Sequence, residues 1–397
     1  KGDIKYMRNV YLDYSATTPV KEAVVKEMIP YFTEHFGNPS SLYSPGLEAK
    51  EGLNLARQRV ADLINAQPEE IYFTSCGTEA DNWVLEGIAE SLKDKGNHII
   101  TSKIEHHAIL HTCQFLEKFG FEVTYLEPDG QGFIKPEDLE AAIKDNTILV
   151  SIMMVNNEIG TIEPIKELAA VAKAHGVLFH TDTVQAIGNI PVDVKELGVD
   201  FASMSAHKIY GPKGIGALYK RRGVNIPSFV HGGGQEKKKR AGTENTAGIV
   251  GFGKAAEIAK ASLTEHAAHS AEMRDYLWEG IKKSIPDILL NGPEDFTKRH
   301  PGNLNVCFSY IEGESILLML DGNGISVSTG SACSSGSLGS SHVLDAIGVP
   351  VTKANGAIRL TTGDLTTKED IDYTVEKLTQ IVSKLRELSP VNGAEGW

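Results

Sequence analysis

The chain has 397 residues, of which 41% are hydrophobic and 23% charged, as is typical of a folded globular protein. This length predicts two or three domains, and no apolar stretch approaches the ~20 residues that cross a membrane. Acidic residues outnumber basic ones by 52 to 39, and the net charge of −13 disfavours direct nucleic-acid binding through a basic surface.

The first two thirds of the chain alternate helical and strand-like segments. Apolar residues of 51–66 share one helical face, and further helices are predicted over Thr78–Leu92, Pro136–Lys144 and Pro164–His175. Short apolar stretches between them predict strands at Ile71–Thr74, His98–Thr101, Phe121–Leu126, Ile148–Val155, Val177–His180, Phe201–Met204 and Ile215–Tyr219. This alternation predicts a mostly parallel sheet covered by helices on both faces.

The last third has a different order of predicted elements. The basic run Lys237–Arg240 predicts a solvated loop, with a local anion site as the alternative, and a long helix follows from Gly242 to about Ile285. A smaller set comes next, with strands predicted at Asn305–Tyr310, Ile325–Ser328 and Ala357–Leu360.

A closing helix is predicted after Thr366–Glu369, which has the pattern of a capping box. Its apolar stripe consists of Ile371, Val375, Leu378, Val382 and Leu385. We therefore predict a large domain over residues 17–255 and a small domain formed by residues 1–16 and 256–397.

The four cysteines are Cys76, Cys113, Cys307 and Cys333, and no two of them form the C-x-x-C pair of zinc or thioredoxin-type motifs. Their pattern predicts no metal site and is typical of thiols in a reducing compartment, which favours a cytoplasmic protein. Residues 1–9 contain no apolar stretch of the kind found in signal peptides. Cys113 and Cys307 lie in apolar contexts and are predicted core residues.

Three segments follow predicted strands and carry polar groups. Thr74–Glu79 turns at Gly77 into a helix beginning with Thr78, which suits an anion; an ordinary helix N-cap is the alternative. Lys208 follows a buried strand and is a candidate Schiff-base nucleophile, unless it is a surface lysine. Asp182 ends another strand, in the crevice where α/β sheets bind ligands, unless it is a loop residue.

These segments together match one cofactor. Pyridoxal phosphate requires a lysine for its aldehyde, an acid for its ring nitrogen and a cradle for its phosphate. The sequence therefore predicts that pyridoxal 5′-phosphate binds at these strand ends.

Cys333 lies in the Gly/Ser-rich segment Ser326–Gly339, which is predicted to be an exposed loop. An exposed thiol that attacks a substrate reacts as a thiolate. An incidental loop cysteine is the alternative, although free cysteines are usually buried.

Seven motifs distributed along the chain are Tyr11–Pro19, Phe36–Ser41, Glu105–Ala108, Val155–Gly160, Ser205–Lys208, Arg240–Asn245 and Gly330–Ser334. They resemble the NifS/IscS-like cysteine desulfurases, relatives of the class-V aminotransferases. The resemblance implies an α/β fold, that of the fold-type-I PLP-dependent transferases, with a large mostly parallel-sheet domain plus a smaller α/β domain. It also implies a homodimer with active sites at the subunit interface.

The same resemblance implies roles for individual residues. Lys208 would hold the cofactor and transfer protons, Asp182 would pair with its ring nitrogen, and His106 would stack on the ring. Further cofactor contacts would come from Asn157, Gln185, Gly77, Thr78, Ser205 and His207, and from Thr243 on the neighbouring subunit's phosphate. Arg359, assisted by Asn38, would bind the substrate carboxylate.

The implied reaction is the removal of sulfur from L-cysteine. The Cys333 thiolate would attack the substrate sulfur, which leaves a persulfide on Cys333 and releases L-alanine. The sulfur would pass to an iron–sulfur scaffold protein or a tRNA-thiolation enzyme. The nearest alternative is a selenocysteine lyase or a small-amino-acid aminotransferase of the same fold.

Two other classes fit the sequence less well. A nicotinamide-dependent dehydrogenase is disfavoured because no G-x-G-x-x-G motif opens a helix after the first strand. An iron–sulfur scaffold built on the four cysteines is disfavoured by their wide separation.

Overall fold

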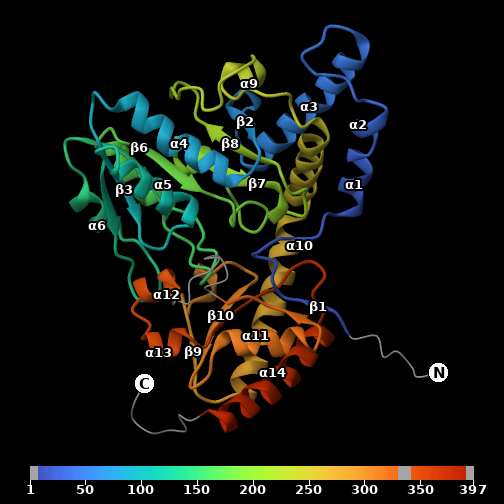
Figure 1. Ribbon diagram of the computed structural model, residues 1–397, viewed down its shortest axis with the longest axis vertical. Helices are drawn as coiled ribbons and strands as arrows, with labels where there is room; N and C mark the ends of the chain where they lie inside the picture. Colours follow the sequence, from blue (N-terminus) through green and yellow to red (C-terminus); the bar gives the residue numbers. More distant parts are fainter. Residues whose placement is uncertain (1–7, 330–340, 390–397) are drawn as a thin grey trace.

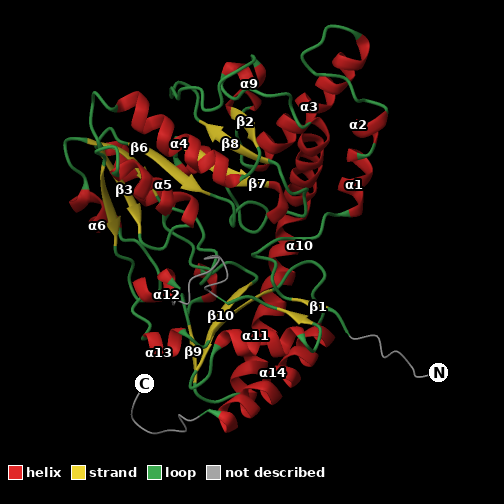
Figure 2. Cartoon of the chain, in the orientation of Figure 1, coloured by secondary structure: helices red, strands yellow, loops and turns green. Residues whose placement is uncertain are grey.

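The structure of the protein is a computed structural model, which describes residues 8–329 and 341–389. Two bodies lie one above the other in Figure 1, and helix α10 (Thr246–Ser284) runs from the upper body into the lower one. Figure 2 shows the strands of the upper body between helices, with smaller sheets in the lower body. Within the described ranges no helix is both long and apolar enough to cross a membrane.

The seven-stranded sheet of the upper body is mostly parallel. Every pair of neighbouring strands is parallel except the two pairs that strand β8 (Gly216–Lys220) forms with its neighbours. The prediction is therefore confirmed. From one edge to the other the strands are β2 (Ile71–Thr74), β8 (Gly216–Lys220), β7 (Phe201–Ser205), β6 (Leu178–Asp182), β5 (Thr147–Ser151), β3 (His98–Ser102) and β4 (Glu122–Leu126).

Helices cover both faces of this sheet. The helices of the upper body are α1 (Glu22–Met28), α2 (Pro30–Thr33), α3 (Ser44–Leu63), α4 (Gly77–Leu92), α5 (His107–Glu117), α6 (Pro136–Ala142), α7 (Ile165–Ala174), α8 (Val194–Leu197) and α9 (Gln235–Lys238). One core joins the sheet to α3, α7 and α10 and includes Val60, Leu168 and Phe252. A second core joins the sheet to α4 and α5 through Trp83 and Ile109. Covering on both faces explains why the central strands are buried throughout.

The lower body has its own core. Its three-stranded antiparallel sheet has the order β12 (Ala357–Thr361), β10 (Asn303–Phe308) and β9 (Ile288–Leu290), and β1 (Val10–Tyr11) pairs in parallel with β11 (Ile325–Ser326). The helices are α11 (Gly313–Asp321), α12 (His342–Ala346), α13 (Val351–Ala354) and α14 (Lys368–Leu388).

Helix α10 serves both cores. Its first half places Ile249 and Phe252 in the upper core, and its second half places Met273 and Leu277 in the lower core. The predicted domain boundary at residue 255 falls inside this continuous helix. The exact division into residues 17–255 and the remainder stays a prediction.

Several predicted element ends differ from the structure; for example, the strand predicted at Ile325–Ser328 ends at Ser326. Two further differences follow from hydrogen bonds. The capping box of α14 is formed by Thr367 and Asp370, one residue later than predicted, because Thr366 instead accepts a hydrogen bond from the Gly363 N–H at 3.0 Å. Strand β5 ends at Ser151 rather than at Val155, because the Met153 N–H donates to the Glu105 carboxylate at 3.0 Å. The apolar stripe of α14 packs into the lower core as predicted.

The basic run Lys237–Arg240 begins in the last two residues of α9. Lys237 and Lys238 are exposed, as the prediction of a solvated loop implies, but the run also makes specific contacts. Lys237 donates to the Glu69 carbonyl at 2.7 Å and Lys239 to the Ile226 carbonyl at 2.6 Å. Arg240 pairs with Glu79, at 2.8 Å between Nε and Oε1. The run therefore fastens the segment before α10 to the upper body.

Candidate active site

A cavity of about 310 Å³ lies where the strands β6 and β7 end, between the two bodies. Parallel strands end at the same edge of a sheet, so residues far apart in the sequence meet there. Most of the predicted site residues line this cavity, namely Gly77, Thr78, His106, Asn157, Asp182, Gln185, Ser205, His207, Lys208 and Arg359. Ser15, Ala16, Cys76, Asp81, Met153 and Val184 complete the lining.

Lys208 ends the short 3-10 helix η2 (Ala206–Lys208), which directly follows β7. Its Nζ donates to the Ala16 carbonyl at 2.9 Å and also to the Ser15 carbonyl. These two carbonyls hold the amine at the wall of the cavity. The side chain therefore does not extend into bulk solvent like a typical surface lysine.

Asp182 is the last residue of β6 and is only 7% exposed. Burial raises the pKa of its carboxyl to about 6, although the Val184 N–H at 2.8 Å and the Lys208 ammonium favour the charged form. A carboxylate at the end of a central strand is positioned to pair with a cationic ring nitrogen.

His106 is the N-cap of α5, and its Nδ1 accepts a hydrogen bond from the Ala108 N–H at 3.1 Å. Burial first, and then the Lys208 cation and the neighbouring histidines, lower the pKa of His106 to about 4. The ring is therefore neutral at pH 7. Because Nδ1 accepts a hydrogen bond, the ring proton resides on Nε2.

The turn into α4 suits a phosphate. The N-cap is Cys76, whose side chain caps nothing, so the alternative of a Thr78 N-cap is wrong. Within the described residues no hydrogen bond uses the N–H groups of Gly77 and Thr78, which the first helical turn leaves free. A Cβ on Gly77 would lie 2.7 Å from the Val184 Cγ2, so only glycine leaves this space open.

Arg359 lies on β12 and is 2% exposed. Its Nη2 pairs with Asp13 at 2.9 Å, and its Nη1 donates to the Asn157 carbonyl at 3.0 Å. Its Nε is buried and has no hydrogen-bond partner among the described residues. A buried guanidinium with an unused donor is suited to a carboxylate ligand.

Three predicted site residues are not brought into this cavity. Asn38 is exposed between α2 and α3, where its Oδ1 accepts a hydrogen bond from Ser40 N–H at 2.9 Å. Thr243 lines a separate cavity of about 80 Å³. Cys333 lies outside the described residues. Their roles stay predictions.

Sequence reasoning missed one ionisable residue that lines the cavity. Asp81 lies one helical turn after Gly77 on α4 and is 1% exposed. The turn at Gly77 could have indicated it, because residues four apart share a helix face. By contrast, the prediction that Cys113 and Cys307 are core residues is confirmed, since both are fully buried.

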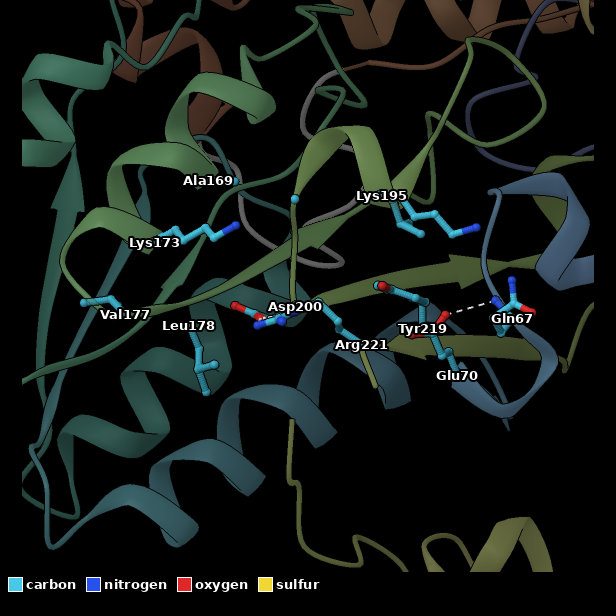
Figure 3. A pocket seen from close by; sticks show the side chains of 13 residues that line it. Gln67, Glu70, Ala169, Lys173, Val177, Leu178, Lys195, Asp200, Tyr219 and Arg221 are labelled. Atoms are coloured by element: carbon cyan, nitrogen blue, oxygen red, sulfur yellow. Dashed lines mark hydrogen bonds and ion pairs between the residues drawn. The ribbon is translucent and has the colours of Figure 1, made fainter. Parts of the chain in front are cut away.

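A second cavity, of about 450 Å³, opens at the amino ends of β6 and β7 (Figure 3). Its two buried carboxylates already have partners. Asp200 accepts hydrogen bonds from the Phe179 N–H and from Arg221, both at 2.8 Å, and Glu70 accepts from the Gln67 N–H at 2.9 Å. No catalytic arrangement follows from this cavity.

A family model described as Aminotransferase class-V matches residues 10–374. The cysteine desulfurase IscS of Clostridium botulinum (strain Hall) is 57% identical over 384 residues, which cover 97% of each chain. The chain belongs to the NifS/IscS-like group of class-V aminotransferases. Another NifS/IscS-like relative, the cysteine desulfurase IscS of Methanosarcina thermophila, is 55% identical over 386 residues, or 97% of this chain and 95% of that protein.

Two solved structures have the same fold. A NifS-like protein superposes with a TM-score of 0.89 at 41% identity, covering 95% of this chain and all of that one. SspA in complex with cysteine superposes with a TM-score of 0.79 at 36% identity, covering 90% of this chain and all of that one. The fold-type-I prediction is confirmed.

Pyridoxal phosphate is the cofactor of class-V aminotransferases, and the residues present fit it. Gly77 and Thr78 offer unused N–H groups for the phosphate. Asp182 offers a carboxylate for the ring nitrogen, and Lys208 offers an amine at the same cavity. These donors match the three requirements of the cofactor, so the structure is consistent with the cofactor prediction.

Proposed function

We propose that the protein is a cysteine desulfurase, which takes sulfur from L-cysteine, releases L-alanine and carries the sulfur as a persulfide on Cys333. The observation that supports this most directly is the meeting of Lys208, Asp182, His106 and Arg359 around one cavity in a NifS/IscS-like chain.

The described residues on either side of the Cys333 segment support its predicted role. Before the segment, the Arg359 N–H donates to the Ser328 carbonyl at 2.7 Å. After the segment, the His342 Nε2 lies 3.0 Å from the Glu105 carbonyl, next to His106. The chain therefore enters and leaves this segment beside residues of the active-site cavity.

Four residues of the cavity and Cys333 have tasks in the proposed reaction. Bound pyridoxal phosphate supplies an electron sink for the charge that develops on the substrate. Lys208 holds the cofactor and then moves a proton, while Asp182 keeps the ring nitrogen cationic. The neutral His106 presents its Nε2–H, and Arg359 orients the substrate carboxylate. Cys333 accepts the sulfur as the carbon–sulfur bond breaks.

An assay of products tests this proposal against its alternatives. With L-cysteine and a thiol reductant, the enzyme should form alanine and sulfide in equal amounts without any 2-oxo acid. An aminotransferase would require the 2-oxo acid and release no sulfide. Measurement with selenocysteine in parallel separates a selenocysteine lyase, which would leave cysteine unused.

We expect the variant Arg359→Lys to raise the KM for L-cysteine by roughly 10- to 100-fold, the range that the loss of one charged hydrogen bond predicts. Lysine lacks the planar fork and the free Nε. The kcat should change less, because the guanidinium is assigned to the carboxylate and not to the reacting sulfur. Steady-state kinetics measure both. Arg8→Lys is the matched control, because Arg8 pairs with Asp370 on the surface; an equal KM for the two variants would contradict the assignment.

We also propose a homodimer. Large apolar side chains are exposed in the segment from the end of α1 to the residue before α3, which lies at the upper right of Figure 1. Exposed apolar residues gathered in one segment favour a protein–protein interface, and Asn38 lies in the same segment. The residues are Ile29, Phe32, Phe36, Leu42 and Tyr43, each more than half exposed.

Sedimentation equilibrium tests the dimer. The wild type should have twice the mass of one chain, and the double variant Phe36→Glu with Leu42→Glu should sediment as a monomer. Phe119→Glu is the control, because Phe119 is 67% exposed but follows α5 on another part of the upper body. A monomeric wild type would rule out the dimer.

The location and the sulfur acceptor are also proposals. Cys76, Cys113 and Cys307 are free thiols, which supports a reducing compartment such as the cytoplasm. The acceptor is an iron–sulfur scaffold protein or a tRNA-thiolation enzyme. Incubation of the persulfide-loaded enzyme with each class of acceptor, followed by mass spectrometry of the acceptor, distinguishes them.

A further inference from the structure

Asp81 is a buried carboxyl that none of the proposed roles uses. It lies on α4, lines the active-site cavity and is 1% exposed. Its Oδ1 has no hydrogen-bond partner within the described part of the chain. An unpartnered carboxyl oxygen in such a position is costly if it is charged and acceptable if it is protonated.

Among the described residues, the groups that act most strongly on Asp81 do not include a cation. His180 Nε2 lies 3.6 Å from Asp81 Oδ1, but both ring nitrogens of His180 already bond to serine hydroxyls, Ser151 at 2.8 Å and Ser203 at 2.9 Å. Burial lowers the pKa of His180 to about 3, so the ring is neutral. The other titratable groups facing Asp81 are Asp182, Glu105 and Cys76, and a negative charge on any of them raises the pKa of Asp81.

Asp81 and Asp182 therefore form an unequal pair. Asp182 receives the Val184 N–H and faces the Lys208 cation, whereas Asp81 has only the Ser203 hydroxyl to favour its charged form. Two carboxyls that share a buried site do not both ionise readily. The pKa of Asp81 is raised by burial first and then by Asp182, so the proton stays on Asp81.

We infer that Asp81 is a positioning residue, which keeps a proton at neutral pH and so leaves Asp182 as the carboxylate that faces the cofactor ring nitrogen. The inference rests on the proposed cofactor site. A second carboxylate at Asp81 would also stabilise the ammonium form of Lys208 and reduce the free amine that must attack. The neutral Asp81 therefore limits the negative charge of this wall of the cavity to one.

Infrared spectroscopy of the holoenzyme tests the protonation directly. At about pH 7 the wild type should show carbonyl stretches of protonated carboxylic acids, and Asp81→Asn should remove one of these bands. Glu105→Gln is the control, because Glu105 is also buried and its own band should be lost while the Asp81 band remains. In Asp182→Asn the Asp81 band should disappear at a lower pH than in the wild type, because the neighbouring negative charge is gone. An unchanged spectrum in Asp81→Asn would overturn the inference.

Cofactor affinity gives a second readout. Asp81→Asn exchanges one neutral group for another, so the Kd for pyridoxal phosphate should change by less than about tenfold, whereas Asp182→Asn should weaken binding by more than that. A loss above tenfold in Asp81→Asn would overturn the inference, while tight binding in both variants would instead contradict the proposed cofactor role of Asp182.

The pH dependence separates protonation from a merely structural role. An acid whose pKa is raised in the folded state binds more protons folded than unfolded, so stability falls as pH rises above about 4. Asp81→Asn removes this loss. The Tm of the variant should therefore rise relative to that of the wild type as the pH is raised from about 5 to 8. A Tm difference that does not depend on pH would contradict a retained proton.

Discussion

Replacement of Lys208 by alanine will abolish the covalent hold on pyridoxal phosphate and lower the rate of sulfur release by roughly 10²- to 10⁴-fold, because the same amine moves a proton in the reaction. The amine lies against the Ser15 and Ala16 carbonyls at the wall of the cavity. Borohydride reduction followed by peptide mass spectrometry should find the cofactor on the Lys208 peptide of the wild type and on no peptide of the variant.

The matched control for this experiment is Lys173→Ala. Lys173 is exposed at the end of α7 and lines the second cavity, on the opposite edge of the sheet. This variant should keep the absorbance of bound cofactor and the wild-type rate. A Lys208→Ala enzyme that keeps both would show that another amine holds the cofactor, and the site assignment would be wrong.

The second large effect is expected at Cys333. The variant Cys333→Ser should lose nearly all release of sulfur, because a serine hydroxyl does not form the thiolate that attacks the substrate sulfur. After brief exposure to L-cysteine, the Cys333 peptide of the wild type should gain the mass of one sulfur atom. The same peptide from the variant should gain nothing.

Cys307→Ala is the control for this loss of sulfur transfer. Burial raises the pKa of Cys307 to about 11, so its thiol stays protonated within β10. The control should therefore still form the persulfide on Cys333. Sulfide production by Cys333→Ser at the wild-type rate would exclude a persulfide at this position.

The mostly parallel direction of the large sheet, though not its strand order, could be predicted because its central strands are buried on both faces. Such strands are continuous apolar stretches, and the helices between them set their parallel direction. Lys208 and Asp182 were predicted to lie together for the same reason, since each follows a strand of that sheet.

Contacts between distant residues could not be predicted in this way. Glu236 is buried because Arg57, 179 residues earlier, forms a two-pronged pair with it, and nothing in the local sequence of either residue indicates the other. The proton on His106 Nε2 likewise follows from a single backbone contact, that of Ala108. The isolation of Asp81 Oδ1, which has no hydrogen-bond partner among the described residues, is visible only in the assembled site.

Helix α10 has a consequence for how the cavity could open. A helix of 39 residues is about 58 Å long, and bending it sharply would break several consecutive backbone hydrogen bonds. Helix α10 therefore resists a hinge motion of one body relative to the other. Substrate entry and product release must therefore depend on local rearrangement of short connecting segments. The distance between the sheet edge and Arg359 stays nearly fixed.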